Sequence, residues 1–544
     1  MKGGLKKYGL IFFSLCISLV SCGQSQKNKE SAQDSAYVDW NRSIAGSFIG
    51  QAKPTFDSVE IYSFFKRYPQ LKQVEKDVYT FYRNRDFTYA WFDNGTLIEQ
   101  AGNLYNRIIN LDNEGISRKI PYQGMLDSLL HLWELDSRKK PNISLELMLT
   151  AHYYIFAKLS WEGMDQSVSE SLNWHLPRKK ANYEDYLDSL LNGPVNKVPN
   201  EPVYRQYALL KAYLLKYKQL EQQESWAPIK YNRSGSQLGD SSLLITKIKK
   251  RLYLLEDYSG DTTNTHFDKE LYNALKTFQQ RNGLAVDGKI GVETVNTLNI
   301  PLRNRIRQIV VNMERNRWLP IAGHTDVLAV NIPDFRLHVF HKDSLLWSCK
   351  VVVGQGTHPT TVFFGELQWV VFRPYWNVPE SIVKHELLPE MKANTNYLAS
   401  HDMEITGYRN GLPVVRQKPG PNNSLGLVKF LFPNSYNTYL HDTPAKSLFG
   451  ESSRAFSHGC IRVEEPVKLA NFLLRHQTEW TPEKISSAMQ HGKETYVRLK
   501  VAVPVFIAYF TAFVGQDQKL NFRKDIYDLD EHLANMIFIA PKRK

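Results

Sequence analysis

The chain is poor in cysteine, with only four in 544 residues. Cys16 lies within an apolar N-terminal run and Cys22 closes it, which leaves Cys349 and Cys460 for the folded body. Two thiols in an oxidising compartment could pair as a structural disulfide. We favour free thiols, because a disulfide would consume Cys460, which its neighbours mark as reactive.

Several functional motifs are also absent. The chain has no Walker loop, no dinucleotide-binding fingerprint and no His-Glu-x-x-His segment, so we expect neither a nucleotide cofactor nor a metal. It has no basic helix or recognisable nucleic-acid-binding module, which disfavours a nucleic-acid partner. The net charge of +13 instead favours anionic surroundings such as a membrane surface or a wall polymer.

The N-terminus has the layout of an export signal. Three lysines precede an apolar run from Tyr8 to Val20, which is too short to span a bilayer as a mature helix. The following Ser-Cys-Gly resembles the end of a bacterial lipobox, so residues 1–22 are predicted to be a lipoprotein signal peptide with Cys22 lipidated. The alternative is an ordinary signal peptide with an incidental cysteine. Residues 23–55 are polar and weakly patterned, and we predict a flexible tether.

Near the C-terminus, a cysteine is surrounded by the groups that thiol chemistry requires. A free thiol is only a few per cent thiolate near neutral pH, so a neighbouring imidazole is its usual activator. His441 precedes Cys460 by nineteen positions and is the candidate base. Gly459 can adopt backbone angles closed to other residues, which lets nearby N–H groups converge as an oxyanion hole requires. The alternative is a structural cysteine in a turn that contains a histidine.

Two segments together resemble the signature of the L,D-transpeptidase catalytic domain of the YkuD type: Tyr439-Leu440-His441-Asp442-Thr443-Pro444 and Ser457-His458-Gly459-Cys460-Ile461-Arg462-Val463. The resemblance implies that Cys460 is the nucleophile and His441 the general base. It also implies that Gly459 contributes to the oxyanion hole and that the backbone carbonyl of Asp442 orients the histidine. The residues expected to contact substrate are Ser457, His458, Arg462, Tyr439 and Trp376, the last on a segment similar to the strand bordering the substrate groove.

The length of the chain leaves room for about three domains. Residues 56–235 are predicted to be mainly helical, and their segments 81–85 and 89–92 are similar to the N-terminal scaffold of the large, three-part members of this family. Residues 236–300 carry two apolar helical stripes and an Asp287-Gly288 turn. They resemble the peptidoglycan-binding domain 1 family. This unit either binds glycan directly or merely braces the enzyme. We favour the first alternative, a role in binding or positioning on the glycan.

From about residue 325 the pattern changes to β-strands, and we predict a β-rich catalytic domain over 325–515. Residues 380–436 are predicted to be an insert that forms a lid over the site, since long loops in compact domains are usually functional or disordered. Residues 516–544 are expected to be a C-terminal extension. The predicted fold class is therefore multi-domain α+β.

The resemblance implies a peptidoglycan L,D-transpeptidase that forms 3→3 cross-links through a cysteine thioester and acts in cell wall biogenesis. Its expected partners are stem peptides and a membrane. The protein itself is expected to be a periplasmic lipoprotein on the outer rather than the inner membrane. Two alternatives are an L,D-carboxypeptidase or wall-peptide hydrolase with the same Cys-His pair, and a non-catalytic wall-binding lipoprotein. The acceptor (stem amine, D-amino acid, protein lysine or water) is not determined by the sequence.

Overall fold

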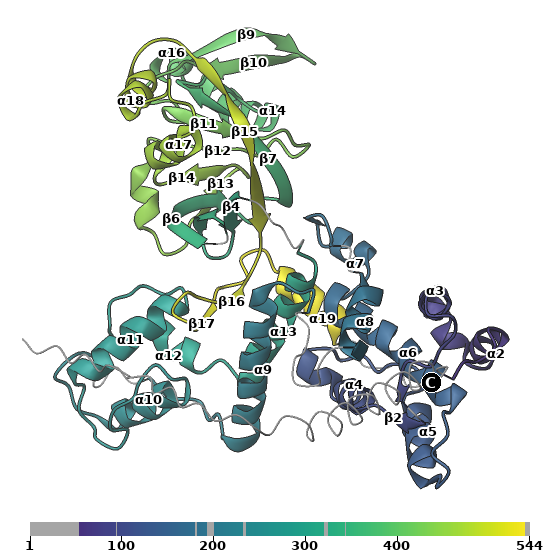
Figure 1. Ribbon diagram of the computed structural model, residues 1–544. Coiled ribbons are helices and arrows are strands. Elements are labelled where there is room, and N and C mark those ends of the chain that lie inside the picture. The colour runs from purple at the N-terminus through teal and green to yellow at the C-terminus, as the bar shows by residue number, and fades with distance from the viewer. Residues whose placement is uncertain are drawn as a thin grey trace, which may run out of the picture. The chain divides into compact units, whose positions relative to one another are not determined.

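The computed structural model describes residues 54–93, 95–179, 182–192, 201–231, 236–319, 325–342 and 344–538 (Figure 1). The predicted signal peptide, the lipidation site Cys22 and nearly all of the predicted tether lie outside the described residues. Within the described ranges, no helix combines the length and the apolar character that a membrane crossing requires.

The N-terminal part is helical, as predicted, and surrounds one central helix. α6, Ile143–Ala157, is buried at every residue from Leu145 onward, as expected for a helix that is mostly apolar and has no polar face. The side chain of Asn142 caps this helix by accepting a hydrogen bond from the N–H of Leu145. The other elements of this part are α2 Val59–Arg67, η1 Pro69–Val74, α3 Glu75–Arg83, β1 Phe92–Asp93, β2 Thr96–Leu97, α4 Glu99–Ile109, η2 Leu111–Glu114, α5 Gln123–Leu135, η3 Lys158–Glu162, α7 Gln166–Ser171 and α8 Tyr183–Asn192.

The two segments that resemble the scaffold family meet at a buried carboxylate, Glu146 of α6. Its Oε1 accepts hydrogen bonds from the hydroxyl of Tyr82 at 2.7 Å and from the N–H of Ala90 at 2.5 Å. Its Oε2 accepts one from the N–H of Trp91 at 3.1 Å. Burial raises the pKa of Glu146 to about 7, against the opposing effect of these hydrogen bonds. The carboxylate therefore joins both segments to the central helix.

Two elements of the predicted scaffold region belong to the core of the catalytic domain. β3, Trp174–His175, pairs in parallel with Val362–Phe363 of the main sheet. α9, Arg205–Gln223, packs its buried face into the same apolar cluster as that sheet. The scaffold's own cluster of buried residues ends at Leu187, well before the boundary predicted at residue 235.

The predicted unit at 236–300 is a small helical bundle with its own apolar core. Its helices are α10 Leu243–Leu254, α11 Lys269–Arg281 and α12 Val292–Leu298. The side chain of Asp268 caps α11. Gly288 has a φ of +69°, as the predicted tight turn requires. The amide of Gln279 closes this turn, because its Oε1 accepts a hydrogen bond from the N–H of Gly288.

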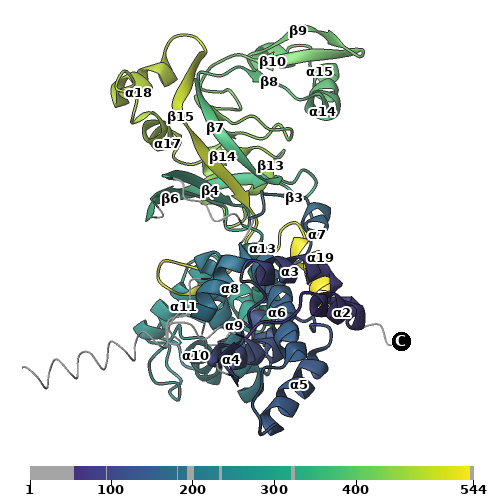
Figure 2. The same cartoon turned by 45° about the vertical axis from the view of Figure 1, so that its right-hand side comes forward.

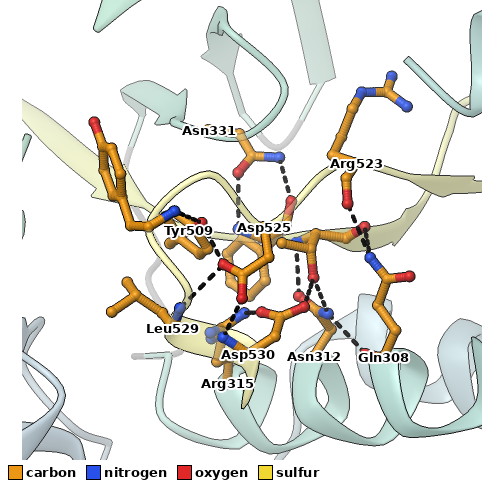
Figure 3. A network of polar contacts seen from close by, with 12 residues as sticks. Gln308, Asn312, Arg315, Asn331, Tyr509, Arg523, Asp525, Leu529 and Asp530 are labelled. Atoms are coloured by element: carbon orange, nitrogen blue, oxygen red, sulfur yellow. Dashed lines mark hydrogen bonds and ion pairs between the residues drawn. The ribbon is translucent and has the colours of Figure 1, made fainter. Parts of the chain in front are cut away.

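The long helix α13, Leu302–Arg317, is joined to the C-terminal segment by the polar network in Figure 3. Asn312 exchanges two hydrogen bonds with Thr511, at 2.7 and 2.9 Å, and Arg315 binds Asp530 at 2.5 Å. The described part of the predicted C-terminal extension is thus ordered against the body of the protein. Its elements, with the preceding strand, are β16 Ala512–Val514, β17 Leu520–Phe522 and α19 Leu529–Ile537.

The catalytic domain is built on a sheet that closes on itself. The strand order is β11-β12-β14-β6-β5-β4-β15-β7-β3, and β11 pairs with β7 as well as with β12. Closure removes the exposed edges that open sheets carry. The strands are β4 Asp326–Asn331, β5 Arg336–His341, β6 Ser344–Gly354, β7 Val362–Phe372, β11 Val428–Leu431, β12 Leu440–His441, β13 Ala455–Ser457, β14 Ile461–Val463 and β15 Thr495–Ala508, with the helices η5 Lys446–Gly450, α17 Pro466–Leu474 and α18 Pro482–Gln490.

The insert forms a separate small layer with its own apolar cluster, seen beside the main sheet in Figure 2. It contains a three-stranded sheet in the order β8-β10-β9. The predicted end of the insert at residue 436 is wrong, because Val428–Leu431 is a strand of the main sheet. The elements are β8 Trp376–Asn377, α14 Glu380–Ile382, η4 Val383–Leu387, α15 Leu388–Ala393, α16 Tyr397–Ser400, β9 Met403–Arg409 and β10 Leu412–Gln417.

Candidate active site

Strand pairing brings the two sequence motifs side by side. β12 and β14 run parallel, with Leu440 opposite Ile461 and His441 opposite Arg462. Leu440 and Ile461 are fully buried in the core of the sheet. Because side chains alternate along a strand, the flanking residues project from the opposite face. Tyr439, His441, Cys460 and Arg462 therefore gather on one outer face of the closed sheet.

The nucleophile candidate sits in a tight loop that its neighbours hold in shape. Gly459 has a φ of +103°, a conformation that side chains other than glycine rarely adopt. The hydroxyl of Ser457 donates to the carbonyl of Cys460 at 2.5 Å and accepts from the N–H of Gly459 at 3.2 Å. The N–H of Gly459, predicted as an oxyanion donor, is thus engaged within the loop. Ser457 is buried and braces this loop.

The carbonyl of Gly459 is held by residues far away in the sequence. It accepts a hydrogen bond from the hydroxyl of Thr360 at 2.9 Å. That hydroxyl accepts one from the N–H of Gly354, also at 2.9 Å. The hydroxyl of Tyr527 accepts from the N–H of Thr360 at 3.1 Å and donates to the carbonyl of Gly354 at 2.6 Å. A residue of the C-terminal segment therefore completes the support of the cysteine loop.

Cys460 is half-buried, and its thiol faces polar groups of the preceding segment. Its Sγ donates a hydrogen bond to the carbonyl of Asn437 at 3.6 Å. Burial raises the pKa of the thiol, and the N–H and hydroxyl of Tyr439 and the charge of Arg462 oppose this effect. The resting cysteine is therefore a neutral thiol that needs a base.

His441 is buried and oriented by the residue that follows it. Its Nδ1 lies 2.5 Å from the backbone carbonyl of Asp442. A carbonyl oxygen can only accept, so Nδ1 carries the proton and Nε2 is left as the acceptor. Burial, with further contributions from the charges of Arg462 and Lys429, lowers the pKa of His441 to about 3. The imidazole is thus neutral near neutral pH.

The carboxylate of Asp442 is itself held in place. It accepts hydrogen bonds from the N–H of Leu427 at 2.8 Å and from the ammonium group of Lys446 at 2.5 Å. Gly426 leaves the space that this carboxylate occupies, since a Cβ there would come within 2.3 Å of its Oδ2. These contacts anchor the carbonyl that orients His441.

Among the described residues, no hydrogen bond joins Cys460 to His441. The two side chains share a face of the sheet, but each is held by a backbone carbonyl. Catalytic hydrogen bonds are often long or misaligned before substrate binds, so this geometry is compatible with a Cys-His pair.

Two further predicted contact residues, His458 and Trp376, are in contact with the insert. His458, two positions before the candidate nucleophile, contacts Glu386 of the insert, with 2.8 Å between Nε2 and Oε1. Trp376 packs against the apolar cluster of the insert and pairs with Gln417, so its ring serves packing at least in part. Sequence reasoning missed Glu386, Thr360 and Lys429. The sequence did mark Lys429 as unusual, because it is a charged residue between apolar ones in a strand-like segment.

The second thiol of the folded body is unsuited to catalysis. Cys349 lies on β6 and is buried, and burial raises its pKa to about 12. Both it and Cys460 are free, so neither is consumed in a disulfide. A buried thiol of this kind is chemically inert.

Three family models match the chain in the order that the sequence predicted. Residues 76–214 match the scaffold domain, residues 241–298 the "Putative peptidoglycan binding domain", and residues 325–503 the L,D-transpeptidase catalytic domain, YkuD. The chain therefore has a catalytic domain of the L,D-transpeptidase class. More specifically, it has the three-part organisation of the large members of that family, as the sequence resemblance predicted.

A curated relative from Haemophilus influenzae, named "Putative L,D-transpeptidase", is 33% identical over 246 residues, which are 42% of this chain and 49% of the relative. The chain thus spans about half the length of that relative. Solved L,D-transpeptidases from Xylanimonas cellulosilytica and Stackebrandtia nassauensis are both 13% identical, with TM-scores of 0.18 and 0.21. The matches cover 51% of this chain and 100% of the first structure, and 52% and 97% for the second.

Proposed function

We propose that this protein is a peptidoglycan L,D-transpeptidase that joins stem peptides through a thioester on Cys460. The observation that supports the proposal is the pairing of β12 with β14, which puts Tyr439-Leu440-His441 alongside Cys460-Ile461-Arg462, with a neutral His441 oriented by the carbonyl of Asp442. This arrangement occurs within the segment that matches the L,D-transpeptidase catalytic domain.

Acylation begins with proton transfer from the Cys460 thiol to Nε2 of His441. The thiol turns away from the carbonyl of Asn437, and the thiolate attacks the carbonyl carbon of the third residue of a tetrapeptide stem. In this proposal the backbone N–H of Cys460 stabilises the oxyanion, since the N–H of Gly459 is bound to the hydroxyl of Ser457. When the tetrahedral intermediate collapses, the C–N bond breaks and the imidazolium returns its proton to the departing amine of the terminal D-residue.

Deacylation repeats these steps with a new nucleophile. The amine of a second stem attacks the thioester, His441 takes a proton from it, and Cys460 leaves as a thiolate that is then reprotonated. The product is a 3→3 cross-link. If water replaces the amine, the product is a tripeptide and the enzyme acts as a carboxypeptidase. That hydrolase is the alternative with the same Cys-His pair.

The insert supports transfer over hydrolysis in this proposal. The 2.8 Å contact between His458 and Glu386 ties the insert to the residue two positions before the proposed nucleophile. An insert held there covers the thioester until the acceptor amine arrives. Because water is far more abundant than any acceptor stem, transfer depends on positioning and exclusion of water.

The other domains support the proposed location and substrate. A peptidoglycan-binding bundle would hold the enzyme on its polymeric substrate, and both domains suit the periplasm. With the lipobox-like segment at Cys22, we propose a lipoprotein anchored to the outer rather than the inner membrane. The non-catalytic alternative is disfavoured by the intact arrangement around Cys460.

The decisive experiment is incubation of the purified protein with disaccharide-tetrapeptides, followed by mass analysis. A dimer that has lost one terminal residue supports transpeptidation. A tripeptide alone supports the carboxypeptidase, and unchanged tetrapeptide supports the wall-binding alternative.

A further inference from the structure

A row of three cationic or titratable side chains crosses three neighbouring strands at the site. Lys429 of β11 lies opposite His441 of β12, and His441 lies opposite Arg462 of β14. Val428 and Phe430 are fully buried in the core, so Lys429 projects to the outer face with His441. By the same alternation, Arg462 projects there between the buried Ile461 and Val463. The candidate base is therefore flanked by a cation on each side.

Neither cation has an anionic partner in the described part of the chain. The carboxylate whose charge acts on Lys429 is Glu494, which lies beyond ion-pair distance and accepts a hydrogen bond from the N–H of Tyr375. Arg462 is influenced by Cys460 but by no carboxylate, and its Nε is buried without a hydrogen-bond partner. Burial lowers the pKa of both groups.

Unpaired, partly buried cations are costly, because each loses hydration without gaining an ion pair. Two other cations of this domain do have carboxylate partners: Lys446 binds Asp442, and Arg523 binds Asp334. At the site, an anion supplied by the ligand would take the place of such a partner. Carboxylates are the anions that a stem peptide carries.

We propose that Lys429 and Arg462 form a subsite that binds one carboxylate of the donor stem peptide across His441. This inference rests on the proposed function and adds a substrate contact to it. The bound carboxylate holds the scissile carbonyl beside Cys460. The bound carboxylate also offsets the two positive charges, which oppose protonation of His441. The carbonyls of Asp442 and Leu425 act in the same direction as the carboxylate, because both favour the protonated imidazole. Donor binding thereby favours the proton transfer that starts acylation.

The carboxylate could come from the C-terminus of the donor or from an internal residue of the stem. Three donors distinguish these sources: the tetrapeptide acid, its C-terminal amide, and a tetrapeptide amidated only at its internal carboxylates. For each, kcat and KM for release of the terminal residue are measured with the wild type, Lys429→Met and Lys429→Arg. Lys500→Met is the matched control, because Lys500 is exposed on β15 of the same sheet.

Lys429→Met is expected to raise KM for the tetrapeptide acid about ten-fold, the size of one charge-assisted hydrogen bond. The same substitution should change KM less than about two-fold for the donor that lacks the recognised carboxylate. Lys429→Arg should recover most of the loss, and Lys500→Met should match the wild type. The donor whose KM does not respond to Lys429→Met is the one that lacks the recognised carboxylate, so it shows which carboxylate binds.

Equal effects of Lys429→Met on all three donors would overturn the subsite, since a structural role does not distinguish substrate charges. Unaltered KM with every donor would overturn it as well. Failure of the proposed function has a different signature, because the wild type would then release no terminal residue from any donor. Thermal melting of each variant separates unfolding from a binding defect.

Discussion

The hydroxyl of Tyr527 donates a hydrogen bond to the backbone carbonyl of Gly354 at 2.6 Å. Through the N–H and hydroxyl of Thr360, this contact supports the carbonyl of Gly459 beside Cys460, the proposed nucleophile. The loop that contains Tyr527 is in turn fixed by Asp525, which accepts a hydrogen bond from Tyr509 at 2.5 Å (Figure 3). A segment beyond the match to the catalytic family thus reaches the cysteine loop.

We expect Tyr527→Phe to lower kcat for acylation of Cys460 by roughly five- to ten-fold, with KM little changed. The estimate follows from losing a hydrogen bond worth about 1 kcal/mol that positions the nucleophile. Tyr253→Phe is the control, because Tyr253 is an exposed tyrosine of α10. A lower melting temperature with unaltered kcat would show that Tyr527 serves stability alone.

Cys460→Ala should abolish both cross-linking and covalent capture of a carbapenem-type acyl donor, as measured by intact mass. Cys349→Ala should leave both largely intact, because that thiol is buried and its pKa is raised to about 12. Persistent labelling of the Cys460 variant would mean that another residue is the nucleophile.

The rate of acylation should be nearly independent of pH between 5 and 7.5. The pKa of His441 is lowered to about 3, so the neutral imidazole that accepts a proton persists throughout this range. A histidine with an ordinary pKa near 6.5 would instead lose about 30-fold in its neutral fraction by pH 5. An acidic limb near pH 6.5 in kcat/KM would contradict the assignment.

His441→Ala should slow acylation by about 10²- to 10⁴-fold, the usual contribution of a general base. The fold should persist, as judged by circular dichroism. Acylation at the wild-type rate would assign the role of base to another group.

Glu386→Ala should raise the ratio of tripeptide to cross-linked dimer without preventing acylation of Cys460. The substitution removes the side-chain contact with His458 that ties the insert to the Cys460 loop. Glu390→Ala is the matched control, since Glu390 is an exposed residue of the neighbouring helix α15. Poor acylation with an unchanged product ratio would show that the insert binds the donor and does not exclude water.

Cys22→Ser should release the protein from the membrane fraction into the soluble periplasm, because the lipobox cysteine is the predicted site of lipidation. Mass analysis of the mature wild-type N-terminus provides the direct check. A wild type that is already soluble and carries no acyl mass would contradict the anchor.

Much of the fold could be predicted from local patterns. The helical scaffold, the bundle at 236–300 and the change to strands near 325 follow from apolar periodicity, and the structure confirms each. The pairing of β3 with β7 could not be predicted, because a two-residue strand has no periodicity to detect. The end of the insert was misplaced for a similar reason. Val428–Leu431 is short, and only its partners β7 and β12 identify it as part of the main sheet.

The sequence by itself determined which residues are the candidates for the chemistry: a cysteine, two histidines and an arginine in two motifs that resemble the family signature. Only the tertiary structure decided how these residues are arranged. The register of β12 and β14 places His441 beside Arg462, and the turn of the chain at Asp442 selects the protonated nitrogen of the imidazole. The tertiary structure also adds Lys429, Glu386 and Tyr527, which come from separate parts of the chain. Contacts of this kind depend on strand register and on closure of the sheet, which are set by packing of the whole domain and leave no signature at any one position.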